Sequence, residues 1–99
     1  MADARSQIEQ MKKIVGMVLK KCTGKHINWD KDVNFLIDLN SIEFISLIVE
    51  LENVLNIEFD DDKLLLDSYS DTNDFLDYLI YKFLILHLLW LFYLIPYYT

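Results

Sequence analysis

Apolar residues recur at spacings of three and four along most of this chain, and few residues interrupt them. The 99 residues include only two glycines and one proline, and no segment alternates apolar and polar residues as a half-buried strand does. A helical period with so few breakers favours helices, and the length allows one domain. We therefore predict an all-α fold, a small four-helix bundle with a long loop between its first two helices.

The first helix is predicted over residues 6–22. Its apolar stripe consists of Ile8, Met11, Val15, Val18 and Cys22. Gly24 follows this stripe and is the expected C-cap. Cys22 is the only cysteine, so it can form no intrachain disulfide and no cysteine-based zinc site. We expect a buried structural thiol in a protein of the reducing cytoplasm.

Residues 25–40 are predicted to form the long loop, because Asn, Asp and Lys are interspersed there among the apolar residues and no helical period continues after Gly24. Its apolar members are expected to pin the loop to the core: Trp29, Val33, Phe35, Leu36, Ile37 and Leu39.

The second helix is predicted to run from Ser41 to about Leu55. Asn40 can cap its free backbone donors, and Glu43, three residues later, can complete a capping box. A polar turn over residues 56–62 leads to a brief third helix over residues 63–66. The last amphipathic helix follows Asp71 and reaches Phe83.

On a helical wheel the second helix has two apolar stripes. The broad one is the expected core face: Phe44, Leu47, Ile48, Leu51, Val54 and Leu55. The opposite side is expected to face water: Glu43, Ser46, Glu50 and Asn53. A smaller stripe beside Ser41 consists of Ile42, Ile45 and Val49, with Glu43, Glu50 and Glu52 flanking it. Either this helix is unusually buried, or the small stripe docks onto an apolar and basic partner.

Charge restricts the partners. Sixteen acidic and nine basic side chains give a net charge of −7, so nucleic acid is not expected to bind. Residues 27–78 hold fourteen Asp/Glu against two Lys/Arg. This acidic middle favours partners with basic surfaces, or it is a solvated face that keeps the protein soluble.

The sequence offers little for catalysis or for metal binding. His26 and His87 have no acidic partner at a short spacing, so we expect no catalytic residue. Asp60, Asp61 and Asp62 lack the spacing, glycine and distal glutamate of a calcium loop, and a solvated turn is expected instead of a metal site. Ser41, in contrast, lies in the first turn of a helix, where free N–H groups and the helix dipole favour an attached anion.

The segment DLNSIEFISLIVELENVLNIEF, residues 38–59, resembles the phosphopantetheine attachment region of acyl carrier and peptidyl carrier proteins. The Asp-Ser-Leu motif of that family stands here as Asn40-Ser41-Ile42. The resemblance covers roughly residues 6–83. Asn40 replaces the usual acid, and Ser46 replaces a second common acid, so the partners can differ from those of fatty-acid carriers.

The resemblance implies a free-standing carrier rather than an enzyme. A phosphopantetheinyl transferase would attach 4'-phosphopantetheine from coenzyme A to Ser41. An acyl- or aminoacyl-loading ligase would charge the thiol of this arm, and downstream enzymes of fatty-acid or secondary-metabolite biosynthesis would receive the thioester. The docking residues would be Ile42, Glu43, Ile45, Val49, Glu50 and Glu52. The alternative is a helical interaction module of the same fold that acts without the prosthetic group.

The carboxyl end does not resemble that family. Phe83 to Tyr98 contains no Asp, Glu, Lys or Arg, and sixteen residues fall just short of a membrane span. We predict a carrier domain over residues 1–83 and an apolar tail over residues 84–99. The tail would contact a membrane, pack on the bundle or on a second copy, or be a non-native extension or the product of a frame change.

Overall fold

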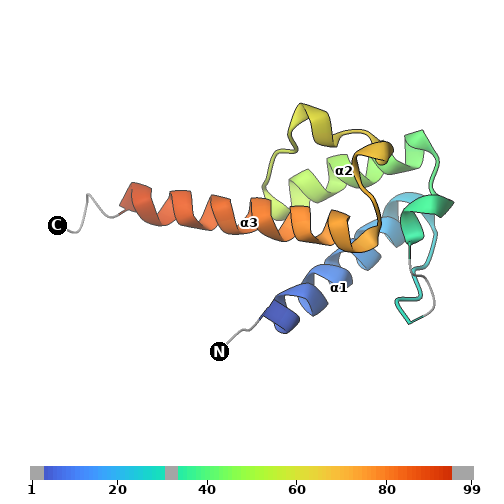
Figure 1. The fold of residues 1–99 in the computed structure, drawn as a ribbon, viewed down its shortest axis with the longest axis horizontal. Helices are drawn as coiled ribbons and strands as arrows, with labels where there is room; N and C mark the ends of the chain where they lie inside the picture. Colours follow the sequence, from blue (N-terminus) through green and yellow to red (C-terminus); the bar gives the residue numbers. More distant parts are fainter. Residues whose placement is uncertain (1–3, 31–33, 95–99) are drawn as a thin grey trace.

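The structure is a computed structural model that describes residues 4–30 and 34–94. Its three α-helices are α1 (Ala4–Thr23), α2 (Ser41–Leu55) and α3 (Thr72–Leu94), and α1 packs against both of the others (Figure 1). The described ranges contain no strand, and the predicted all-α class is confirmed.

Gly24 ends α1 as predicted. Its φ of 76° lies in the left-handed region, which a residue with a Cβ adopts only with strain. Its N–H donates to the carbonyl of Lys20 at 2.9 Å. This cap turns the chain out of α1 and directs the next residue, Lys25, toward the start of α2.

The long loop contains one short 3-10 helix, η1 (Phe35–Asp38). Phe35, Leu36 and Leu39 are buried as predicted, and Trp29 packs partly against the core. Ile37 was predicted to pin the loop, but 76% of it is exposed, because the tight turn that buries its neighbours directs this residue outward. Val33 lies outside the described residues.

The brief third helix is replaced by two 3-10 turns, η2 (Asp61–Lys63) and η3 (Leu66–Ser68). The backbone at Leu65 is extended, with φ −102° and ψ 141°, and interrupts any continuous helix. Leu64 and Leu66 thereby pack partly against the core, while Leu65 is 68% exposed. The described ranges therefore hold three α-helices, not four.

An aromatic cluster around Phe75 joins the elements. The ring of Phe75 is fully buried, and its centroid lies 5.0 Å from Tyr69, 5.9 Å from Phe44 and 6.2 Å from Phe35. These partners come from the η3 segment, α2 and η1, so one side chain of α3 packs against all three. The contacts with Tyr69 and Phe35 are edge-on, and such contacts stabilise the cluster beyond the area that the rings bury.

The last helix does not end at Phe83. It continues to Leu94 and projects from the bundle (Figure 1). Ile80, Phe83 and Leu86 still pack partly against the core, whereas Leu88 is 55% exposed. Within the described ranges, no helix combines the length and apolar character needed to cross a membrane.

Candidate functional site

The start of α2 has the predicted capping box. Asn40 Oδ1 accepts a hydrogen bond from the Glu43 N–H at 2.8 Å, and Glu43 Oε1 accepts one from the Asn40 N–H at 3.1 Å. Two backbone donors that lack helical acceptors are satisfied in this way. Asn therefore performs the capping role of an acid at this position.

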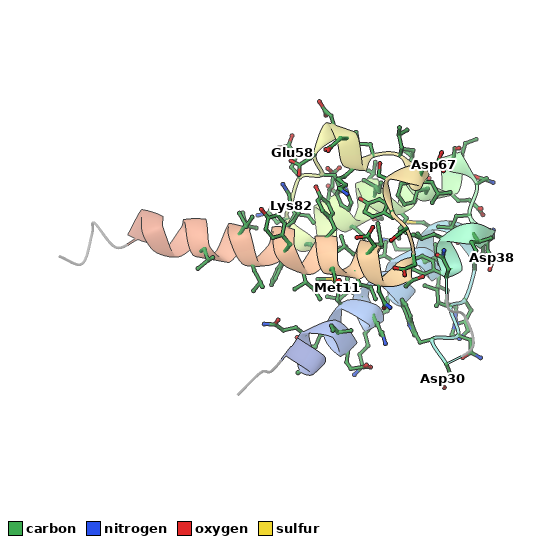
Figure 2. All side chains as sticks on the ribbon, viewed as in Figure 1. Met11, Asp30, Asp38, Glu58, Asp67 and Lys82 are labelled. Atoms are coloured by element: carbon green, nitrogen blue, oxygen red, sulfur yellow. The ribbon has the colours of Figure 1, made fainter. Side chains whose placement is uncertain are left out.

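Ser41 is the first residue of α2, and it is exposed. Its hydroxyl makes no hydrogen bond to the part of the chain that the structure describes. The preceding Asp38 lies at the end of the molecule opposite to the projecting end of α3 (Figure 2). Ser41 therefore offers an accessible nucleophilic oxygen beside the positive end of a helix dipole, which favours an attached anion.

An exposed apolar stripe begins directly after Ser41. Ile42 is 80% exposed, Ile45 45% and Val49 50%, and their spacing of three and four places them on one side of α2. We call these three residues the α2 patch. Each of them is exposed despite being apolar, so the patch is not part of the core.

The carboxylates that flank the α2 patch already have partners within the chain. Glu43 Oε1 lies 2.9 Å from Lys25 Nζ. Glu50 Oε2 lies 3.7 Å from Lys21 Nζ, an ion pair too long to be a hydrogen bond, and this buried oxygen accepts no hydrogen bond from the described residues. Glu52 Oε2 accepts a hydrogen bond from the Phe59 N–H at 2.9 Å. These interactions of the three acids also hold α2 against α1 and against the turn that follows α2.

The hydrogen bond from Lys25 and then that from the Asn40 N–H hold the pKa of Glu43 below its usual value. Both donors stabilise the ionised carboxylate. The charge of Glu43 is therefore present at neutral pH and is offset by an ammonium group.

Two expectations from the helical wheel are wrong. Val54 was assigned to the core face but is 54% exposed. Glu43, Ser46 and Glu50 were expected to face water but are half-buried, because the end of α1 and Lys25 pack there. Asn53 is exposed as predicted.

The thiol of Cys22 lies at this α1–α2 contact. Its Sγ is 3.8 Å from the Ser46 carbonyl oxygen, and burial, followed by the charge of Glu50, raises the pKa of the thiol. A raised pKa leaves the thiol protonated and weakly nucleophilic. Cys22 is half-buried and not buried as expected, but its contact with α2 agrees with a structural role.

The other candidates do not form a second site. His26 is exposed, and the side chain of His87 lies outside the described residues. Asp60 accepts hydrogen bonds from Tyr78 Oη at 2.8 Å and from Lys82 Nζ at 3.3 Å. In the described ranges no group of three or more His, Cys, Asp or Glu could hold a metal ion.

Lys25 is the residue near Ser41 that sequence reasoning missed. It lies eighteen positions before Glu43, and no local pattern links the two. The one available signal was Gly24, since a helix that ends in a left-handed turn directs the next residue back across its own end.

Comparison with known families identifies the chain. Residues 9–79 match the family model of the phosphopantetheine attachment site, which is most of the chain, and the protein belongs to that family. No curated protein and no solved structure matches it significantly.

Members of this family carry covalently attached 4'-phosphopantetheine and are not catalysts. The protein is therefore a phosphopantetheine carrier and not an enzyme. A carrier of this class interacts with a phosphopantetheinyl transferase and with biosynthetic enzymes.

Proposed function

We propose that Ser41 is the attachment residue and that the protein carries an acyl or aminoacyl group as a thioester on the phosphopantetheine arm. The observation that carries the proposal is the exposed Ser41 hydroxyl at the first position of α2, within the matched region. The capping box satisfies the neighbouring backbone groups, so the hydroxyl is not needed as a cap.

The attachment reaction transfers the arm from coenzyme A. A bond forms between Ser41 Oγ and the phosphorus that bears the pantetheine, and the diphosphate bond of coenzyme A breaks. The departing 3',5'-ADP takes the electron pair, and a base of the transferase takes the hydroxyl proton. The carrier supplies an accessible oxygen and a helix end that accommodates the resulting anion.

Partner enzymes are proposed to dock on the α2 patch, with Glu43, Glu50 and Glu52 at its rim. Three exposed apolar side chains next to Ser41 support this proposal, because a docking enzyme must reach the attachment residue. Because the three acids already have partners within the chain, we expect apolar contact to contribute most of the docking free energy. The net charge of −7 acts on basic partners at longer range.

The cargo is loaded by an acyl- or aminoacyl-activating ligase and passed to downstream enzymes of fatty-acid or secondary-metabolite biosynthesis. We place the protein in the cytoplasm, which its single cysteine supports.

We propose residues 1–83 as the carrier domain and residues 84–99 as an apolar extension, in keeping with a family match that ends at residue 79. This extension is proposed to contact a membrane or a second copy.

The test is uptake of the arm by the full chain. Wild type is incubated with a phosphopantetheinyl transferase, Mg²⁺ and coenzyme A, and its intact mass should rise by one phosphopantetheine. Ser41→Ala should show no increase, while Ser46→Ala, a serine on the same helix, should be modified like wild type. Modification of Ser41→Ala, or failure of wild type with several transferases, would contradict the proposal and favour a module that acts without the arm.

A further inference from the structure

Lys25 connects the two sides of the Ser41 segment. Its Nζ donates to Glu43 Oε1 at 2.9 Å and to the backbone carbonyl of Asp38 at 2.5 Å. Asp38 precedes Ser41 by three residues, and Glu43 follows it by two. One ammonium group therefore contacts the chain both before and after the attachment residue.

The backbone of Lys25 is itself anchored to the end of α1. Its N–H donates to Thr23 Oγ1 at 3.1 Å, and that hydroxyl donates to the Leu19 carbonyl at 2.8 Å. The preceding Gly24 is hydrogen-bonded to Lys20. Because the backbone of Lys25 is fixed to the end of α1, the contacts of its side chain can set the position of the start of α2 relative to α1.

The charge of Lys25 also lies beside the turn that would bear the phosphodiester. Glu43 Oε1 accepts from both Asn40 N and Lys25 Nζ, so one carboxylate oxygen closes the capping box and pairs with the ammonium group. A phosphodiester on Ser41 adds negative charge to the turn that carries Glu43. The ammonium group offsets the repulsion between the two anions.

We propose that Lys25 is a positioning residue for the modification of Ser41. It holds and neutralises Glu43, and it thereby fixes the start of α2 in a form that accepts the phosphodiester. It takes no part in the proton transfer. This inference rests on the proposed function, because it assumes that Ser41 bears the arm.

The first experiment measures kcat and KM for arm attachment with the full chain as substrate. Lys25→Met is expected to lower kcat/KM about two- to fivefold, the range for a partly exposed ion pair, mainly through kcat. Lys25→Arg should recover most of the loss. Lys82→Met is the matched control, because it breaks a comparable ion pair between Lys82 of α3 and Asp60, and it should react like wild type.

The second experiment needs no transferase. In the unmodified protein, Lys25→Met should speed hydrogen exchange at the Asn40 and Glu43 amides and raise the pKa of the Glu43 carboxyl in NMR titration. The melting temperature should stay close to that of wild type. If Lys25→Met proves unstable, Lys25→Gln replaces it, since an amide can still donate to the Asp38 carbonyl.

The outcomes separate this inference from the proposed function. If wild type is never modified, the proposed function fails and this inference fails with it. If wild type is modified and the Lys25 variants match it in kcat and amide exchange, only this inference is overturned. A lower KM with unchanged kcat would also overturn it, because Lys25 would then act only as a surface charge that weakens attraction to a basic transferase.

Discussion

At the scale of residues, the first turn of α2 depends on one side chain next to it in the sequence and on one from a distant segment. Asn40 supplies the acceptor for the Glu43 N–H, and Lys25 supplies the cation for the Glu43 carboxylate. Ser41 lies between these contacts and takes part in neither. A residue that is to be modified is thus held by its neighbours while its own hydroxyl stays accessible.

The ionisation of Glu43 should make stability depend on pH in the acid range. Its pKa is lowered on folding, so its stabilising contribution is present above the pKa of an unfolded Glu, about 4.3, and is lost as pH falls through the folded value. Glu43→Gln should be less stable than wild type at pH 7 but lose less stability between pH 7 and pH 3. Urea unfolding at both pH values measures this, and equal losses in the two proteins would show that Glu43 contributes no pH dependence.

At the scale of elements, α2 carries two exposed valines, one inside the α2 patch and one outside it. Substituting each in turn distinguishes a docking contact from a general effect of changing the surface. Val49 belongs to the α2 patch and is 50% exposed, while Val54 is 54% exposed on another side of the same helix. The two differ in which way they face but not in type or exposure. They therefore form a matched pair for testing the patch.

Val49→Asp should weaken transfer to or from partner enzymes by about 1–2 kcal/mol, or about five- to thirtyfold in kcat/KM, because it places a charge in an apolar contact. Val54→Asp should leave transfer unchanged, and circular dichroism should show similar helical content in both. Equal losses in the two variants, or a collapse of thermal stability in Val49→Asp, would remove the patch from the docking surface.

Local features of the elements could be predicted from the sequence, but the contacts that each element makes with distant segments could not. Asn40, Glu43 and Gly24 act within a few positions of themselves, so the capping box and the end of α1 followed from pattern alone. The exposure of Val54 and Ile37 and the ion pair of Lys25 depend on which segments meet in space. The prediction of a third helix over residues 63–66 was wrong, because the packing of Leu64 and Leu66 against the core outweighed the helical preference of that short segment.

At the scale of the whole molecule, one continuous helix, α3, belongs to the globular bundle in its first half and projects from the bundle in its second half. A groove of about 280 Å³ lies where α3 leaves the bundle, and its lining is largely apolar: Gln7, Gln10, Met11, Ile14, Leu55, Ile80, Phe83 and Leu84. Ser41 begins α2 and Leu55 ends it, so the groove lies at the other end of that helix from the attachment residue. The carrier site and the apolar extension are therefore spatially separate.

This separation predicts that the extension can be altered without affecting arm attachment. Leu88→Lys places a charge at a position that is 55% exposed and lies beyond the core. It should reduce self-association in sedimentation if the extension contacts a second copy, or binding to lipid vesicles if the extension contacts a membrane, while the rate of arm attachment stays within about twofold of wild type. A large drop in attachment rate would show that the extension supports the carrier site.

The most direct test of the central claim is to locate the arm on the modified wild-type chain. After incubation with transferase and coenzyme A, the protein is digested and the peptides are sequenced by tandem mass spectrometry. We predict one phosphopantetheine per chain, on Ser41 and on no other serine. An arm on Ser46, Ser68 or Ser70, or a chain that stays unmodified while a known carrier in the same reaction is converted, would contradict the account.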